Sequence, residues 1–350
     1  MEAEFELHRG PVDELQAGWE ALFAADPQVT PYASWGWSRA WWRHFAEDAQ
    51  PWVLTAHSDG ELVGLVPLVI HRRGPFRIVR ALGRDPGDYW DMLALPGAHA
   101  AVATAAAREL VRRRRQWDLV DVGRIPPESP LTDALTGPGL TSQRLVRTPC
   151  PTIDLAPSFD EYLAGLPTAR RTNFRRRLRH LDEGELELTE VDAVEEIPAA
   201  VDRWQAMRVR QWREMGKQLA PMHASRRMRD FMVDLLEWLV PAGLALIWEF
   251  HREGELVGSF VNFVDEGAFY QYLGGFEPRL ARLGIGKIAT CHGIRTSIEA
   301  GRRRYDFMVG EEEYKYQYGA VARYATSVIV SGAGPRSRAA VGLQRLKRSL

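Results

Sequence analysis

Apolar residues recur at helical spacing near the start of the chain. Leu15, Trp19 and Leu22 share one face of a predicted helix over residues 12–25, and three tryptophans mark a second helix over 34–45. Alternating or continuous apolar runs bounded by turn residues predict strands between them. The further elements predicted in this half are strands over residues 5–8, 52–57, 62–70, 76–82 and 119–122 and a helix over 98–115. The strands 52–57 and 62–70 are expected to form a hairpin.

The second half repeats this plan at larger size. Its predicted helices cover residues 159–181, two long segments around Trp204 and Leu235, and residues 285–300, and its predicted strands are 186–191, 244–251, 256–264, 268–273 and 305–309. The run DGELVGLVPLVI in the first half recurs as EGELVGSFVNFV in the second. Each copy is a turn followed by Glu-Leu-Val-Gly and an apolar strand, which indicates duplication of one α/β domain type.

The length of 350 residues exceeds that of one ordinary domain. We place the boundary where Pro149 and Pro151 flank Cys150. The predicted division is residues 1–150 and 151–334, followed by a basic tail over 335–350. The tail carries five basic and no acidic residues, and we expect a solvated terminal helix.

Composition narrows the class of protein. The acidic first residues lack the pattern of a secretory signal and no apolar run is long enough to span a bilayer, so a cytoplasmic, bacterial protein without stable membrane insertion is expected. Two cysteines favour neither a disulfide framework nor a cysteine-built metal site, and no metal is expected. Only four of the 45 basic residues are lysines. Lys287 and Lys315 are therefore retained in a chain that prefers arginine, and the two cations are not interchangeable.

A glycine-bearing segment follows the predicted strand 268–273 and opens the helix at 285. Backbone amides at a helix start point outward, the helix dipole favours negative charge there, and glycines let phosphate oxygens approach the main chain. An anion site is expected at this loop, although an ordinary tight turn would show the same glycines. The candidate cofactor-binding residues are Arg279, Arg282, Leu283, Gly284, Ile285, Gly286 and Lys287.

This loop resembles the acyl-CoA pyrophosphate loop of GNAT acetyltransferases. The pattern there is Arg or Gln, two residues, Gly, any residue, and Gly or Ala. Gly284 and Gly286 match the glycines, whereas Ala281 stands where Arg or Gln is expected. The resemblance implies acetyl-CoA or another acyl-CoA as donor.

The segment 299–319, EAGRRRYDFMVGEEEYKYQYG, resembles the end of the second domain in BioF2-like or CelD-like acetyltransferases. The matching residues are Gly301, Asp306, Phe307, Gly310, Glu311, Glu312, Tyr314, Lys315 and Gly319. The basic segment 169–181 is similar to the helix that opens this domain there and in Fem aminoacyl transferases. Together with the first-half DYWDML, the resemblance implies two tandem GNAT-like domains, each a mixed, mostly antiparallel sheet flanked by helices.

An acyl thioester is already activated, so an amine can attack it once deprotonated and aligned. Glu312 is the leading candidate for general base, with Glu311 and Asp306 behind it, because clustered carboxylates raise one another's pKa. Tyr314 is the candidate acid for the leaving thiolate. Lys315 is the candidate for holding an anionic or carbonyl oxygen.

Candidate substrate-binding residues come from three segments: Asp88, Tyr89, Trp90 and Asp91; Arg171, Asn173 and Arg175; and Tyr270 and Tyr272. The arginine-rich segment could meet phosphates or form a solvated face. The function expected is acyl-CoA-dependent N-acylation of a small-molecule amine or sugar derivative, with no DNA partner. Two alternatives stay open: a Fem-like transferase that uses aminoacyl-tRNA, and a non-catalytic binding protein of a polysaccharide or secretion pathway. The oligomeric state is not predicted.

Overall fold

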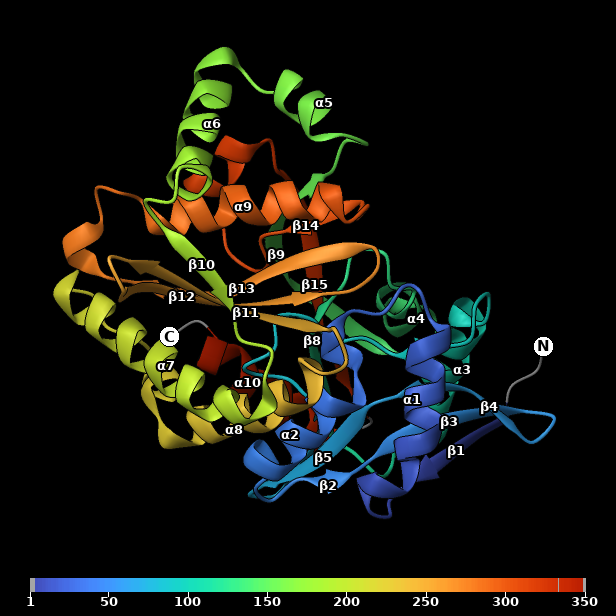
Figure 1. The fold of residues 1–350 in the computed structure, drawn as a ribbon. Helices are drawn as coiled ribbons and strands as arrows, with labels where there is room; N and C mark the ends of the chain where they lie inside the picture. Colours follow the sequence, from blue (N-terminus) through green and yellow to red (C-terminus); the bar gives the residue numbers. More distant parts are fainter. Residues whose placement is uncertain (1–3, 333, 349–350) are drawn as a thin grey trace. The chain divides into compact units, whose positions relative to one another are not determined.

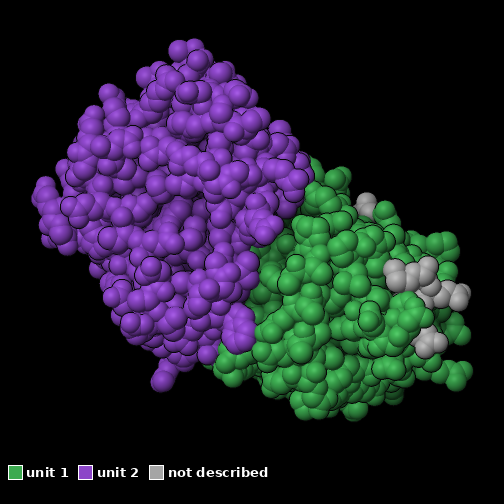
Figure 2. Space-filling view, turned by 45° about the vertical axis from the view of Figure 1, so that its right-hand side comes forward, with its two compact units in different colours: residues 1–149, 324–350 green, residues 150–323 purple. Residues whose placement is uncertain are grey.

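The computed structural model describes residues 4–332 and 334–348. These residues form two compact units, residues 1–149 with 324–350 and residues 150–323 (Figure 2). Strands β9 (Thr141–Asp154) and β15 (Val321–Ser331) each contribute residues to both units. The first unit contains residues from both ends of the chain, unlike the division expected from the sequence. The domain limits of 1–150 and 151–334 therefore stay a prediction.

The first unit combines two sheets with helices. One sheet has the order β1-β3-β4-β7, and the other strands follow the order β15-β8-β6-β5-β2 with β6 and β8 parallel. The elements are β1 (Glu4–His8), η1 (Val12–Leu15), α1 (Gln16–Ala25), η2 (Pro31–Ala33), α2 (Trp35–Phe45), β2 (Gln50–Pro51), β3 (Val53–Ser58), β4 (Glu61–Val66), β5 (Leu68–Arg73), β6 (Phe76–Ala81), β7 (Leu93–Ala94), α3 (His99–Arg112), β8 (Leu119–Ile125), α4 (Leu131–Thr136) and α10 (Pro335–Arg348).

The hairpin predicted over 52–57 and 62–70 is correct only in its first part. Strands β3 and β4 pair, but the second predicted strand ends at Val66 and resumes as β5, which pairs with β6. Pro67 separates them, because proline has no amide hydrogen for a sheet ladder. Its carbonyl accepts hydrogen bonds from the Leu82 amide and the Trp90 indole instead.

The C-terminal tail is helical, as predicted, and part of its first turns packs on the sheet, which was not expected of a solvated helix. In α10, Ala340 is buried with Ile78, Leu119 and Ile329 of the sheet. Packing at Ala340 is favourable because it removes apolar surface from water. Ser349 and Leu350 of the predicted tail lie outside the described residues.

The second unit is one sheet between two layers of helices (Figure 1). Its strand order is β10-β11-β12-β13-β14-β9, and every pair is antiparallel except β13 with β14. The elements are α5 (Phe159–Ala164), α6 (Thr168–Asp182), β10 (Glu187–Glu190), η3 (Val194–Glu196), α7 (Ile197–Glu214), η4 (Pro221–Ala224), α8 (Arg226–Leu239), β11 (Ala245–Arg252), β12 (Glu255–Val264), β13 (Ala268–Phe276), η5 (Pro278–Leu280), α9 (Ile285–Glu299), β14 (Arg304–Asp306) and η6 (Glu313–Tyr318).

The two faces of this sheet are covered by different helices. Helix α9 packs on β12, β13 and β14 and carries α6 and α5 on its outer side, whereas α7 packs on the opposite face with α8 beside it. Glycines show which residues face which helix: a Cβ on Gly258 would meet Ile285 of α9, and one on Gly275 would meet Arg208 of α7. Among the described residues no helix combines the length and apolar character needed to cross a bilayer.

Candidate active site

Strand β13 contains a bulge at the centre of the second unit. Val261 of β12 pairs with Leu273 and Phe263 pairs with Tyr270, so two steps on β12 oppose three on β13. An extra residue in one strand reverses which of its side chains face each side of the sheet. Gln271, before the reversal, contacts α9, whereas Gly275, after it, faces α7.

The neighbouring strand diverges at the same level. Strands β13 and β14 pair in parallel only from Ala268–Arg304 to Tyr270–Asp306, and β13 then continues to Phe276 paired with β12 but not with β14. Bulge and divergence together leave backbone groups of β13 beyond Tyr270 without a β14 partner. Such groups can bind an extended ligand by main-chain hydrogen bonds.

A cluster of polar side chains lies at this opening on the α9 face. The Tyr305 hydroxyl donates to Gln271 Oε1 at 2.8 Å. Thr290 Oγ1 lies 3.1 Å from the same oxygen and 2.9 Å from the Gly286 carbonyl, so its one proton serves one of the two. Gln271 Nε2 in turn lies 3.5 Å from the Tyr314 hydroxyl. Gln271 therefore connects β13, α9 and η6.

Asn262 adds an unpartnered donor to this face. It lies two residues after Phe260, whose ring faces α9, on the uninterrupted β11–β12 ladder, so alternation gives it the same face. It is 3 % exposed, and its Nδ2 makes no hydrogen bond. A buried amide without a partner is costly and indicates a ligand-binding role.

The glycine-bearing segment that was predicted to bind phosphate leads directly into α9. Gly284 is the N-cap in the left-handed region (φ 75°), and no side chain caps the helix. The backbone amides of Ile285 and Gly286 make no hydrogen bond within the described residues. Gly286 is partly exposed, and a Cβ on it would meet only the Phe276 ring at 3.7 Å, so there is space beside its main chain. This helix start has the features of an anion site.

Arg177 brings the charge that Ala281 does not supply. Arg177 lies on α6, and its Nη1 donates to the Leu283 carbonyl. A Cβ on Gly284 would collide with its guanidinium. Of the arginines predicted for this loop, Arg279 is exposed and pairs with Glu255 at 2.6 Å, and Arg282 is exposed. The sequence singled out the basic helix but not this residue of it.

Lys315 fixes the loop after β14. It is 3 % exposed, and its Nζ lies 3.2 to 3.5 Å from the carbonyls of residues 308–310 and 2.8 Å from Glu312 Oε2. These contacts occupy the ammonium group that was predicted to meet a substrate oxygen. Glu312 is itself mostly exposed and close to Tyr314, whose pKa it helps to raise.

Tyr314 is the predicted catalytic residue that the structure brings into the polar cluster. Burial raises its pKa to about 12, and the negative charge of Glu312 acts in the same direction. The hydroxyl therefore keeps its proton at neutral pH. Glu311 is exposed, and Asp306 is buried with its carboxylate accepting the Met308 amide at 2.7 Å.

The other predicted substrate residues lie in varied surroundings. Tyr270 is buried and donates to Asp265 at 2.8 Å, and the ring of Tyr272 packs on Phe263. On α6, Arg175 and Asn173 are exposed, Asn173 accepts from Arg176, and Arg171 is partly buried with an unpartnered Nε.

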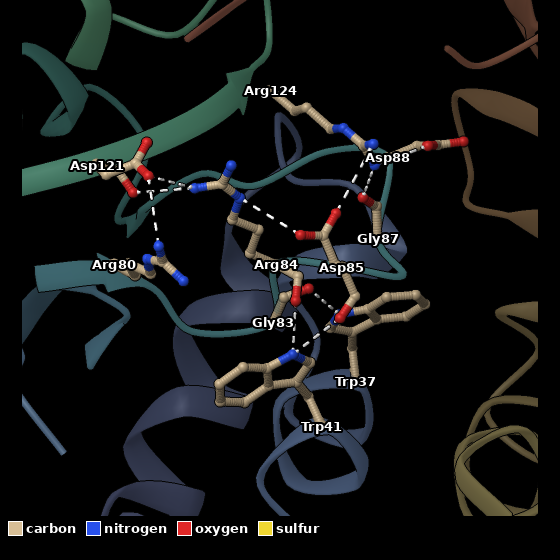
Figure 3. A network of polar contacts seen from close by, with 10 residues as sticks. All are labelled: Trp37, Trp41, Arg80, Gly83, Arg84, Asp85, Gly87, Asp88, Asp121 and Arg124. Carbon is tan, nitrogen blue, oxygen red and sulfur yellow. Dashed lines mark hydrogen bonds and ion pairs between the residues drawn. The ribbon is translucent and has the colours of Figure 1, made fainter. Parts of the chain in front are cut away.

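In the first unit, the segment 83–88 belongs to a charge-balanced network (Figure 3). Asp121 lies between Arg84 and Arg80, and Arg124 contacts Asp88 at 3.1 Å and Asp85 at 3.8 Å. Two tryptophans of α2 fix the loop from the other side. Their indole N–H groups donate to the carbonyls of Gly83, Arg84 and Asp85. Both tryptophans are buried.

The remaining predicted residues of this unit pack inward. Trp90 and Tyr89 are buried, and the Trp90 indole donates to Pro67. Asp91 Oδ1 accepts hydrogen bonds from Ser129 Oγ at 2.6 Å and from the Met92 amide at 2.8 Å. Desolvation nevertheless raises the pKa of Asp91 to about 7.

This pKa predicts a pH dependence of stability. Folded Asp91 binds a proton below pH 7 that the unfolded chain releases near pH 4, so the free energy of unfolding falls as pH rises through that window, by at most about 1.4 kcal/mol per unit. We expect Asp91→Asn to remove this slope. Urea midpoints of both proteins at pH 5, 6, 7 and 8 measure it.

A matched control and a correction accompany that measurement. Asp13→Asn, at an exposed position, should keep the wild-type slope. His99 also loses stabilisation as pH rises, because its hydrogen bond to Asp26 raises its pKa. The difference between wild type and Asp91→Asn isolates Asp91, and equal slopes would contradict the prediction.

Comparisons with known proteins bear on the fold. Residues 168–316 match the family model described as acetyltransferase (GNAT) domain. None of the curated proteins compared matches the chain. Within residues 4–332 and 334–348, no group of three or more His, Cys, Asp or Glu side chains is arranged to hold a metal ion.

Three solved structures are similar over nearly the whole chain. FemX has a TM-score of 0.62 at 10% identity, covering 92% of this chain and 96% of that one. The C-terminal domain of a putative lysylphosphatidylglycerol synthetase from Agrobacterium fabrum has 0.58 at 12%, covering 95% of each. L-PGS from Bacillus licheniformis has 0.58 at 12%, covering 94% and 96%. The predicted fold class of two GNAT-like α/β domains is confirmed.

Proposed function

We propose that this chain, which carries a GNAT domain over residues 168–316, is an N-acyltransferase that moves an acyl group from acyl-CoA to an amine of a small molecule or sugar derivative. The observation that carries the proposal is the polar cluster around Gln271 at the divergence of β13 and β14, next to the start of α9, where the Gly286 amide has no hydrogen-bond partner among the described residues. One ligand with a diphosphate and an extended acyl arm would contact both.

The reaction needs few groups. The amine nitrogen attacks the thioester carbonyl carbon, the carbon–sulfur bond breaks, one proton leaves the amine and another reaches the thiolate. In this proposal Asn262 Nδ2 donates to the carbonyl oxygen as its charge develops, and Tyr314 protonates the sulfur. Glu312 accepts the amine proton, directly or through water, with Lys315 holding its carboxylate in place.

The second candidate function is aminoacyl transfer from tRNA. The absence of Arg or Gln at position 281 and the exposed arginines of α6 favour it, since they would suit an RNA backbone. FemX and lysylphosphatidylglycerol synthetase share the fold at 10 to 12% identity, which leaves the donor open. The open glycine loop favours CoA.

A ligand titration separates these functions. We expect acetyl-CoA or a longer acyl-CoA to raise the melting temperature of the purified protein by several degrees, because a ligand at about 100 times its Kd adds about 2.7 kcal/mol to the free energy of unfolding. Arg177→Gln should weaken this effect, whereas Arg176→Gln, one residue along α6 and exposed, should not.

Other results would redirect the assignment. Stabilisation by charged tRNA but by no acyl-CoA would replace the main proposal with the second one. Stabilisation by neither ligand would leave a binding protein of a polysaccharide pathway as the better explanation.

A further inference from the structure

Arg208 is a buried arginine on the face of the sheet opposite to α9. It projects from α7 onto β13, and a Cβ on Gly275 would collide with its backbone and Cγ. The guanidinium is held on two sides: Nη1 donates to the Gly274 carbonyl at 2.8 Å, and the carbon atom Cζ lies 5.7 Å from the centre of the Trp204 ring. The residue is 7 % exposed.

The other edge of this guanidinium has no protein partner. Its Nε is buried without a hydrogen bond, and Nη2 makes none within the described residues. Nε and Nη2 form the flat edge that binds the two oxygens of a carboxylate. Arg203, on the same helix, uses that edge on Glu249 at 2.8 and 3.1 Å.

Among the residues that the structure describes, no carboxylate forms an ion pair with Arg208. Burial lowers its pKa to about 10, and the group that acts in the opposite direction is Tyr272 rather than an acidic residue. The partly buried arginines of the first unit differ, because Arg80 and Arg84 share Asp121. A buried cation without an anion lowers stability, so its retention indicates a ligand.

Two further polar groups near Arg208 lack partners. Ser259 pairs with Gly275 across β12 and β13, so its side chain lies on the same face, where its hydroxyl is buried and unpartnered. His223 of η4 has a buried Nδ1 without a partner, and its pKa is lowered by burial and by the charge of Arg208. A hydroxyl and a neutral imidazole suit the remaining hydrogen bonds of an oxyanion.

We propose that Arg208 binds the oxyanion of a ligand, a carboxylate or a phosphate, on the α7 face of β13, with Ser259 and His223 completing the site. If the proposed function holds, this ligand is the amine acceptor, so the identity of the ligand rests on the proposed function. The binding of the anion does not rest on it, because binding requires no acyl donor.

The test uses the two anions themselves as probes. Sodium acetate and sodium phosphate are titrated against the full chain, with sodium chloride at equal ionic strength as reference, while the melting temperature is followed. We expect one of the two to stabilise the wild type above chloride. Arg208→Met should bind that anion at least 10-fold more weakly, and which anion is active distinguishes carboxylate from phosphate.

Control variants separate binding from folding. Arg213→Met, exposed on the same helix, should bind like the wild type. Arg208→Met itself should melt at the same or a higher temperature, because methionine fills the space without a buried charge. If it does not fold, Arg208→Lys decides, since it keeps the charge but loses the flat edge. Wild-type affinity for the anion in Arg208→Met or Arg208→Lys, or no stabilisation of the wild type by either anion above chloride, would overturn the proposal.

Discussion

Gly286→Val is expected to abolish stabilisation by acyl-CoA while leaving the fold intact. A Cβ at this position would contact only the Phe276 ring, and the first turn of a helix tolerates valine at a cost below about 1 kcal/mol. Its side chain would cover the amides to which the phosphates are proposed to bind, so we expect the Kd for acyl-CoA to rise by about 100-fold or more. Calorimetric titration of both proteins measures it.

The opposite end of the same helix provides the control. Ala300 is the exposed C-cap residue of α9, so Ala300→Val should bind acyl-CoA like the wild type. Equal affinity of Gly286→Val and the wild type would place the phosphates elsewhere, and the proposed use of the α9 start would be abandoned.

Tyr314→Phe is expected to lower kcat by about 100-fold with little change in KM for acyl-CoA. Its hydroxyl is proposed to act only when the thiolate leaves, and general acid catalysis typically contributes factors of this size or more. The fold should persist, because the hydrogen bond lost to Gln271 is long. Release of the CoA thiol in the presence of a panel of primary amines gives both constants.

Two comparisons sharpen this experiment. Tyr162→Phe removes a structural hydroxyl, which donates to the Tyr318 carbonyl at 2.9 Å, and should lower stability by about 1 kcal/mol without changing kcat. Glu312→Gln tests the base: it should spare acyl-CoA binding and slow turnover. A Tyr314→Phe protein with wild-type kcat would remove the tyrosine from the mechanism.

Much of the secondary structure follows from local pattern. The hairpin β11–β12 and helix α9 lie within a residue or two of their predicted ranges, because each has a clear periodicity and glycine at its ends. Strands β9 and β15 were not predicted, since their pairing depends on chain far away in sequence. The strand predicted over 305–309 ends at Asp306, and two residues later Met308 adopts a positive φ.

The site was predictable only where a short segment determines it. Gly284 and Gly286 indicate the start of a helix, and Tyr314 belongs to the segment 299–319, which resembles a known family. The bulge that reverses β13 depends on its register with β12, which no local pattern reveals. Arg177 and Arg208 are hidden among many arginines, because only packing shows which of them is buried. Asn262 within the apolar run SFVNFV was the one available signal.

The bulge in β13 also bears on how this protein can change. Gln271 and Gly275 are four residues apart on one strand but serve opposite faces of the sheet. Substitutions on one face can therefore alter what is bound there while the other face keeps its chemistry. Removing one residue from the bulge would instead exchange the two faces over the rest of the strand. We therefore expect point mutations near the bulge to change ligand specificity, and deletions in the bulge to be removed by selection.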